Sequence, residues 1–262
     1  MRDNPVKRTL LAGGSAIGTM VTEFATPGIA RLAAGAGAEF VLFDLEHTGY
    51  GIERLRSVLA AAEASGVVPF LRVPDADYHF VSRGLDIGAL GLMVPSVEDP
   101  AEARAIVQAA RFPPDGRRGF GLLLLRDEFE PEGLPATLAK ANDATLLLVQ
   151  IETAAGLERV EEIAAVDGVD VLWVGHFDLT ASLGIPGEFA SERYDRALDR
   201  VVAAGRAHGK SAGMVCGSAE EGASLLARGF RLLAYSIDLI IYQEALRAGI
   251  SELAAARDAL PR

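Results

Sequence analysis

Apolar positions along the chain fall into short continuous runs rich in Val, Ile, Leu and Phe, separated by longer stretches of helical period. Runs that are apolar at every position predict strands buried on both faces, as in a parallel sheet. We predict strands at Ala16–Val21, Phe40–Phe43, Val67–Val73, Gly91–Val94, Thr145–Ile151, Val169–Gly175, Ser211–Val215 and Arg231–Tyr235.

Between most of these runs lie amphipathic stretches. They predict helices at Ile29–Gly35, Ile52–Ala64, Pro100–Ala110, Gly156–Ala165, Tyr194–His208 and Ala219–Ala227, and an apolar-rich helix at Leu239–Leu253. Eight strands alternating with helices in 262 residues predict a (β/α)8 TIM barrel that forms a single domain over residues 1–262. An open doubly wound sheet is the alternative, and it needs a phosphate-binding glycine loop after an early strand. Gly35 and Gly37 stand instead at the end of a helix, where a C-cap is expected.

Two segments interrupt this alternation. Residues 1–21 carry Arg2, Lys7 and Arg8 ahead of an apolar stretch broken by glycines, which we interpret as the lead-in to the first strand rather than a signal peptide. Phe112–Asn142 is rich in proline and glycine, and we predict a long loop there. A loop of this length in a compact domain is usually functional.

Composition narrows the classes of function. Half of the residues are apolar, the formal net charge is −11, and no run of Lys or Arg occurs. These features exclude nucleic acid and anionic membrane as expected partners. No apolar run approaches the ~18 residues of a membrane span. Cys216 is the only cysteine, so neither an internal disulfide nor a cysteine-based zinc site is expected. We therefore expect a soluble cytoplasmic protein.

Polar residues follow the second, third, fifth and sixth predicted strands, at the end where a TIM barrel has its active site. They are Asp44, Glu46, His47, Arg72, Gln150, Glu152, His176 and Asp178. Each alone could be a solvated loop residue or, as for Asp178, a helix N-cap. The whole set, on strand ends that meet at one rim, favours an active site.

Glu152 and Asp178 would form an oxygen-rich pocket of the kind that Mg²⁺, Mn²⁺ or a similar divalent ion prefers. A Schiff-base aldolase would instead need a buried lysine near this rim. The chain has only Lys7, Lys140 and Lys210, and none follows a predicted strand at the active end. An enolate in this barrel would therefore need a metal ion to stabilise it.

The remaining rim residues suit substrate binding and proton transfer. Arg72 can bind a substrate carboxylate through two parallel hydrogen bonds. His47 can move a proton near neutral pH, with Asp44 or Glu46 to orient it. The role of His176 stays open between a pocket residue and an ordinary loop residue.

These residues lie within segments that resemble the HpcH/HpaI aldolase family, the class II pyruvate aldolases, from about Gly18 to Asp238. The matching segments are FDLEH at Phe43–His47, LRVP at Leu71–Pro74, GALGLMVPSVEDPAEA at Gly88–Ala103, RFPPDGRRGFG at Arg111–Gly121, VQIETAAGL at Val149–Leu157 and VDVLWVGHFDL at Val169–Leu179.

The resemblance implies a phosphoenolpyruvate/pyruvate-type barrel that forms hexamers, with the last helix exchanged between subunits. It implies a role for each matching residue. The metal ligands for Mg²⁺, Mn²⁺ or Co²⁺ would be Glu152 and Asp178, and Arg72 would bind the pyruvate carboxylate. The acid/base would be His47, supported by Asp44. The substrate pocket would include Gln150 and Phe177.

The sequence departs from the family pattern at two places. His176 stands where many members have proline after the glycine that ends the sixth strand. Leu122–Phe129 replaces a segment that contains Arg-Ala in many aldolases. Both regions are expected to shape the aldehyde end of the pocket.

The expected reaction is reversible cleavage of a 4-hydroxy-2-oxo acid to pyruvate and an aldehyde. One alternative is oxaloacetate decarboxylation or another metal–enolate reaction on the same site, which incubation with oxaloacetate would distinguish. A second is a non-catalytic barrel that serves as a binding or assembly subunit, which a metal titration would distinguish.

Overall fold

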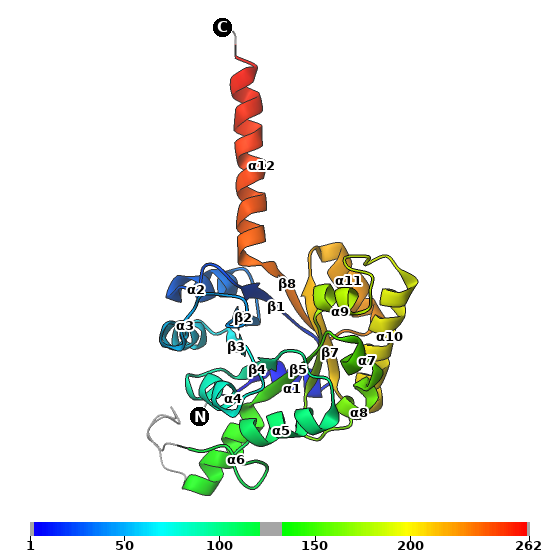
Figure 1. Cartoon of the computed structure of the whole chain (residues 1–262). Helices are drawn as coiled ribbons and strands as arrows, with labels where there is room; N and C mark the ends of the chain where they lie inside the picture. Colours follow the sequence, from blue (N-terminus) through cyan, green and yellow to red (C-terminus); the bar gives the residue numbers. More distant parts are fainter. Residues whose placement is uncertain (1–2, 121–132, 261–262) are drawn as a thin grey trace.

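The computed structural model describes residues 3–120 and 133–260, whose eight strands close into a parallel barrel in chain order (Figure 1). The strands are β1 (Ala16–Val21), β2 (Phe40–Asp44), β3 (Val68–Arg72), β4 (Gly91–Val94), β5 (Leu146–Ile151), β6 (Val171–Val174), β7 (Ser211–Cys216) and β8 (Leu232–Ile237). Pairing of β1 with both β2 and β8 closes the sheet. The predicted TIM barrel is confirmed, with each strand within two residues of its expected bounds.

Helices surround the barrel and occupy most of the predicted stretches (Figure 1). They are α1 (Pro5–Leu11), α2 (Pro27–Gly35), α3 (Ile52–Ala64), α4 (Tyr78–Asp86), α5 (Pro100–Ala110), α6 (Leu134–Ala144), α7 (Ala154–Glu158), α8 (Val160–Ala164), α9 (His176–Ser182), α10 (Glu192–Ala207), α11 (Ala219–Arg228) and α12 (Asp238–Asp258). The single helix predicted at Gly156–Ala165 is wrong: Arg159, with φ −111° and ψ 15°, divides it into α7 and α8.

The interpretation of residues 1–21 as a lead-in to the first strand is wrong in part, because α1 precedes β1. Asn4 caps this helix by accepting a hydrogen bond from the backbone N–H of Lys7, and Pro5 stands in its first turn. Val6 and Leu10 are buried in the core inside the barrel. The helix therefore covers the end of the barrel opposite the predicted active site.

The loop predicted at Phe112–Asn142 is also wrong in part, because its last third belongs to α6. Asn142, in α6, binds the backbone of Phe112 at the start of the segment. Its side chain accepts from the backbone N–H of Phe112 at 2.7 Å and donates to the carbonyl oxygen of the same residue at 3.0 Å. Residues 121–132, which include the predicted pocket segment Leu122–Phe129, lie outside the described residues.

The barrel interior is packed with large side chains opposite glycines. Phe40 and Phe70 stack with ring centroids 4.6 Å apart. A Cβ on Gly18 would lie 2.2 Å from the carbonyl oxygen of Phe40, and one on Gly91 would lie 2.3 Å from the ring of Phe70. These two glycines therefore leave room for the rings, which fill the barrel beneath the predicted site.

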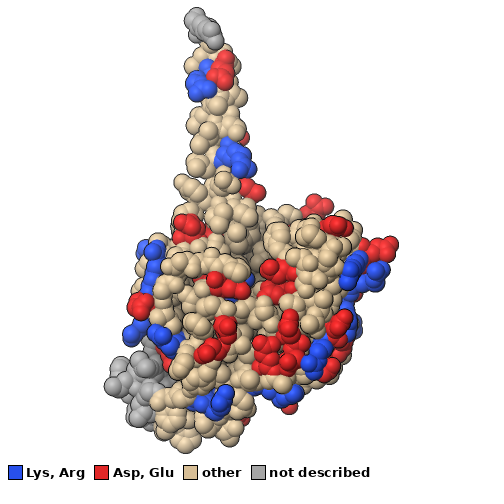
Figure 2. Space-filling view, in the orientation of Figure 1, with Lys and Arg blue, Asp and Glu red and all other residues tan. Residues whose placement is uncertain are grey.

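α12 leaves the barrel and projects away from it, with the C-terminus at its far end (Figure 1). Of its 21 residues only Asp238, at its base, is buried. Figure 2 shows that most of the projecting surface carries no charge. In the described parts of the chain, no helix combines the length and hydropathy that a membrane crossing requires.

Candidate active site

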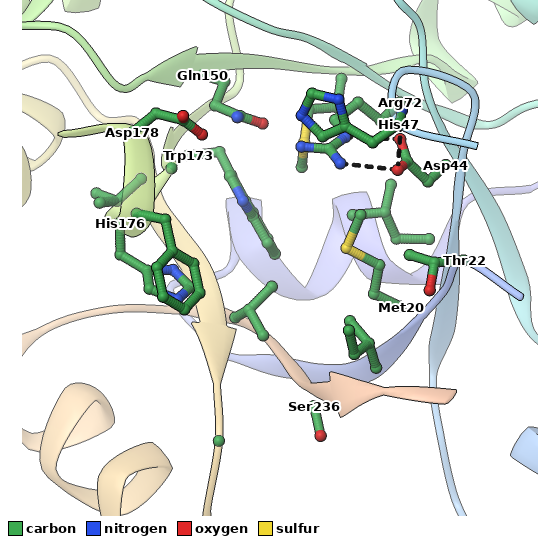
Figure 3. A pocket seen from close by; sticks show the side chains of 18 of the residues that line it. Met20, Thr22, Asp44, His47, Arg72, Gln150, Trp173, His176, Asp178 and Ser236 are labelled. Carbon is green, nitrogen blue, oxygen red and sulfur yellow. Dashed lines mark hydrogen bonds and ion pairs between the residues drawn. The ribbon is translucent and has the colours of Figure 1, made fainter. Parts of the chain in front are cut away.

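A cavity of about 630 Å³ opens at the C-terminal ends of the strands, and most of the predicted site residues line it (Figure 3). The lining includes Asp44, His47, Arg72, Gln150, Phe177 and Asp178. Glu152 lies behind this lining and is hydrogen-bonded to Gln150. Apolar side chains from inside the barrel, Met20, Leu42, Met93 and Trp173, complete the wall. The structure therefore brings the predicted residues together.

Arg72 and Asp44 form a buried ion pair at paired positions of β2 and β3. Nε of Arg72 donates to Oδ1 of Asp44 at 2.8 Å, and Nη2 donates to Oδ2 at 2.9 Å. Oε2 of Glu46 lies 3.0 Å from Nη1. Burial disfavours the charged guanidinium, but the hydrogen bonds and charge of Asp44, with the charge of Glu46, outweigh it and raise the pKa of Arg72. Arg72 is thus held in one orientation as a permanent cation.

His47 stands at the mouth of the cavity, with 64% of its side chain exposed. Its backbone N–H donates to Oδ2 of Asp44 at 3.3 Å, whereas its ring Nε2 lies 3.7 Å from Oε2 of Glu46. Glu46 is therefore the carboxylate beside the ring, and Asp44 supports His47 through the backbone. Burial raises the pKa of Glu46, although Arg72 and His47 oppose this effect.

Both carboxylate oxygens of Glu152 are engaged, and the side chain is 4% exposed. Ser96 donates to Oε1 twice, from its backbone N–H at 2.7 Å and from its hydroxyl at 2.8 Å. The amide of Gln150 donates to Oε2. Ser96 adopts a φ of 54°, a left-handed conformation that is uncommon for residues other than glycine. This strained residue therefore fixes the orientation of Glu152.

The donor set fits a divalent cation. Oε1 of Gln150 is buried without a hydrogen-bond partner, so the site holds an unused acceptor. A Cβ on Gly175 would lie 2.3 Å from Oε2 of Glu152, so glycine is needed where β6 meets α9. Among the described residues, no group of three His, Cys, Asp or Glu side chains is placed to hold a metal ion without other ligands. Glu152 and Asp178 supply carboxylate oxygens, the donor type that Mg²⁺ and similar divalent ions prefer.

Asp178 does not cap α9. Gly175 is the N-cap, and Asp178 lies in the first turn of the helix beside the cavity. The explanation of this residue as an ordinary N-cap is therefore wrong.

None of the three lysines lines this cavity. Lys7 lies at the opposite end of the barrel, where its amino group donates to the carbonyl oxygen of Thr145 at 2.7 Å and lies 3.7 Å from Asp170. Burial lowers the pKa of Lys7, but no substrate in the cavity could reach it. Lys210 precedes β7 at the same end, and Lys140 belongs to α6. The position of the lysines thus agrees with an enolate that is not stabilised by an imine.

Aromatic rings form the wall of the cavity that extends from α9. His176 lies 4.4 Å from Phe177 and 5.5 Å from Phe189 between ring centroids, and Phe189 lies 5.6 Å from Tyr194. Burial lowers the pKa of His176, with Glu221 and Asp178 opposing this effect. His176 therefore lines the pocket, which answers the question that the sequence left open.

Sequence reasoning missed Ser96, Phe189, Tyr194 and Glu221. Ser96 had a usable signal, because it stands just after the fourth strand on the active rim. Glu221 also had one, since Ser218 and Glu221 have the spacing of a capping box at the start of α11. Ser218 accepts from the backbone N–H of Glu221 at 3.1 Å, and Glu221 accepts from that of Gly217 at 2.7 Å. Nothing in the sequence pattern marks the two aromatic residues, which follow α9 in the chain.

Five of the six segments that carry the resemblance contribute described residues to this cavity, and comparison with known families agrees. The HpcH/HpaI aldolase/citrate lyase family matches residues 20–245. The chain belongs to this family. It is an aldolase, an enzyme that makes or breaks a carbon–carbon bond.

Relatives with assigned activities cover most of the chain. A hydroxypyruvate/pyruvate aldolase from Deinococcus radiodurans is 38% identical over 93% of this chain and 87% of its own length. A 2-keto-3-deoxy-L-rhamnonate aldolase from Klebsiella pneumoniae is 34% identical over 93% of this chain and 90% of its own. The crystal structure of an HpcH/HpaI aldolase from Desulfitobacterium hafniense superposes with a TM-score of 0.91 at 31% identity, covering 98% of this chain and 97% of that one.

Proposed function

We propose that this aldolase cleaves 4-hydroxy-2-oxo acids to pyruvate and an aldehyde, and catalyses the reverse addition, with a divalent metal ion. One observation supports the proposal: the fixed cation Arg72, the carboxylate of Asp178 and the amide of Gln150 line one cavity, and Gln150, whose amide oxygen has no hydrogen-bond partner, donates to the buried carboxylate of Glu152. A 2-oxo acid presents a carboxylate and a keto oxygen side by side, which suits this combination of charges.

Each residue has a defined task in this reaction. Glu152 and Asp178 would hold a Mg²⁺, Mn²⁺ or Co²⁺ ion, which as a Lewis acid stabilises the enolate of pyruvate. Arg72, held rigid by Asp44, binds the substrate carboxylate and sets the plane of the scissile bond. Gln150 and Phe177 shape the substrate pocket. His47 takes the proton from the 4-hydroxyl group, directly or through a water molecule, during cleavage.

The two relatives with assigned activities support the choice of substrate class, because their names specify pyruvate, hydroxypyruvate and a 2-keto-3-deoxy sugar acid. Each of these compounds is a 2-oxo acid. The common part of such substrates is the part that Arg72, Glu152 and Asp178 would bind.

Metal dependence is the test of this proposal. Exhaustive chelation should abolish turnover of pyruvate with an aldehyde, and Mg²⁺, Mn²⁺ or Co²⁺ should restore it. Borohydride with pyruvate should not trap a covalent adduct, since no lysine lines the cavity. Full activity after chelation, or a trapped adduct, would refute it. Oxaloacetate offered in parallel measures decarboxylation by the same site.

We further propose that the chain assembles into a homo-oligomer, as a hexamer, in which copies exchange α12. The 21-residue helix has only its first residue buried, although it carries many apolar side chains. Isolated helices are marginally stable in water, so a helix that extends from the barrel needs a packing partner. A second copy of the chain supplies a surface of matching chemistry.

A further inference from the structure

We propose that the part of the cavity between β6, β7 and the base of α12 is the acceptor subsite, and that it takes a neutral aldehyde with an apolar substituent in preference to an anionic one. The inference rests on the proposed function, because it names the aldehyde class that this site would use. Two observations carry it: the side chains that line this part of the cavity, and the sign of their charges.

Apolar and aromatic side chains dominate this part of the lining. The residues are Val215 from β7, Ile237 from β8, Leu239 and Ile240 from α12, and the rings of His176, Phe177, Phe189 and Tyr194. Ring centroids of Phe177 and Phe189 lie 5.3 Å apart at 81°, an edge-to-face contact. A hydrocarbon chain or ring placed against these groups would remove apolar surface from water, whereas a polyhydroxylated chain would lose hydrogen bonds to water.

The charges in the described lining oppose an anion. Asp44, Asp178 and Glu221 are carboxylates, and Arg72 is the one Lys or Arg side chain among the described residues that line the cavity. Arg72 is already paired with Asp44 and lies beside Glu46. A second carboxylate on the aldehyde would therefore face Glu221, and no further Lys or Arg side chain of the described lining is there to pair with it.

The two rings at this end of the wall contribute aromatic faces. The ring centroid of His176 lies 4.4 Å from that of Phe177 and 5.5 Å from that of Phe189. Burial and the charge of Glu221 raise the pKa of Tyr194, whose hydroxyl keeps its proton. Arg228, the cation near Tyr194, lies 3.0 Å from Asp199 and also pairs with Asp195.

The position of this subsite relative to Arg72 and His47 agrees with the assignment. The aldehyde carbon must reach the methyl carbon of the bound pyruvate, while its oxygen faces a proton donor. Figure 3 shows Arg72, Asp44 and His47 grouped on one side of the cavity, and His176 on the other. With its carbonyl group between the pyruvate and His47, an acceptor extends its substituent toward the aromatic wall.

A matched pair of aldehydes tests the inference. We compare 4-oxobutanoate with its methyl ester, which has the same chain without the charge, as acceptors for pyruvate in the metal-loaded enzyme. We expect kcat/KM to be at least about 10-fold higher for the ester, and higher still for an alkyl aldehyde of similar length. Equal values for the acid and the ester, or a preference for the acid, would overturn it.

Three variants test whether the aromatic side chains and Glu221 cause this preference for uncharged aldehydes. Glu221→Gln should raise the ratio of kcat/KM for 4-oxobutanoate to that for the ester about 3- to 10-fold. Phe189→Ala should lower the value for the alkyl aldehyde about 10-fold. Phe80→Ala on α4 is the control, because Phe80 and Phe189 are both 41% exposed and Phe80 lies outside the cavity. If Phe80→Ala and Phe189→Ala behave alike, the aromatic wall is not the acceptor subsite.

Exchange of the pyruvate methyl protons with deuterium separates the two proposals, since it needs the enolate and no aldehyde. If exchange is absent in the wild-type protein, the proposed function fails. If exchange is present but the acid and ester react equally well, only the acceptor inference fails.

Discussion

Among single residues, His47 and the pair of carboxylates are assigned different tasks, so their replacements should fail in different ways. Glu152→Ala or Asp178→Ala removes a proposed metal ligand and a negative charge, and metal affinity should fall. His47→Ala should keep metal and pyruvate binding but slow cleavage by ~10²–10⁴-fold, as expected for a lost general base. Calorimetry of Mn²⁺ binding beside turnover measures both. Loss of the metal in His47→Ala, with retention in Glu152→Ala, would reverse the assignment.

Arg72 offers a second test, because its proposed role depends on the planar shape of the guanidinium as well as on its charge. Asp44 occupies one edge of the guanidinium through Nε and Nη2, and Glu46 lies 3.0 Å from Nη1. One N–H of Nη1 and one of Nη2 are left for a substrate. A lysine cannot bind Asp44 and a substrate carboxylate in this way. Arg72→Lys should lower kcat/KM for pyruvate addition about 10- to 100-fold, the value of a charged hydrogen-bonded pair. Metal affinity should stay near that of the wild type, and wild-type kinetics would contradict the role in carboxylate binding.

Ser96 should act through Glu152. Ser96→Ala removes the 2.8 Å hydroxyl hydrogen bond to Oε1 and should weaken Mn²⁺ binding about 10-fold, as for other partners of metal ligands. Ser96→Gly loses the same bond but relieves the left-handed φ of 54°, so it should bind metal similarly and unfold at a higher temperature than Ser96→Ala. Ser57→Ala, on the surface of α3, is the control. Unchanged metal affinity in both Ser96 variants would show that Ser96 does not position Glu152.

The sequence could predict the residues that end strands and carry charge, but not the contacts between them. Asp44, Arg72, Glu152 and Asp178 were found because parallel strand ends meet at one rim. The pairing of Asp44 with Arg72 depends on the register of β2 and β3, which a residue pattern does not specify. Phe189 and Tyr194 were missed because they enter the cavity from beyond α9, where no periodic signal relates them to the strands.

Among whole elements, α1 shows a signal that was present but outweighed. Asn4 followed by Pro5 is a typical helix start. Gly13, Gly14 and Gly18 break the apolar pattern that follows, so the strand gives the stronger signal in this segment. The reason that α6 was not predicted is different. The side chain of Asn142 holds this helix by binding the backbone of Phe112, 30 residues earlier. Contacts that distant in the chain leave no local pattern. The buried apolar strands, whose pattern is local, were all found.

Asn4 should stabilise the barrel end that α1 covers. Its amide donates to the carbonyl oxygens of Leu90 at 3.1 Å and Ala144 at 2.9 Å, in addition to capping the helix. Asn4→Ala removes the helix cap and takes a hydrogen bond from the carbonyl oxygen of Ala144, whereas Leu90 keeps one from the backbone N–H of Leu146 at 2.8 Å. The change should lower the free energy of unfolding by about 2 to 3 kcal/mol. Urea denaturation measures this. Leu11→Ala, at the exposed end of the same helix, should change it by less than about 0.5 kcal/mol. Equal effects of the two changes would contradict a specific role for Asn4.

For the whole molecule, the base of α12 and its remainder have different surroundings. Asp238 accepts hydrogen bonds from the backbone N–H groups of Thr22, Glu23 and Phe24, and Phe24 makes an edge contact with Tyr242. The base is therefore fixed to the loop after β1. Beyond it, Leu246, Ile250 and Leu253 are exposed. Because the base of α12 is fixed, these exposed apolar side chains form a surface on which another copy of the chain can pack.

Oligomer formation should therefore depend on the apolar positions of α12 and not on its charged ones. Light scattering should give the wild-type protein the mass of a hexamer. The double variant Ile250→Asn/Leu253→Asn should shift the mass toward smaller species, because it places polar groups in the contact between copies. The double variant Arg247→Asn/Glu252→Asn is the matched control: it lies on the same helix and introduces the same residue, so any loss of helix stability is shared. If the wild-type protein has the mass of one chain, or if both variants dissociate equally, exchange of α12 is not what holds the copies together.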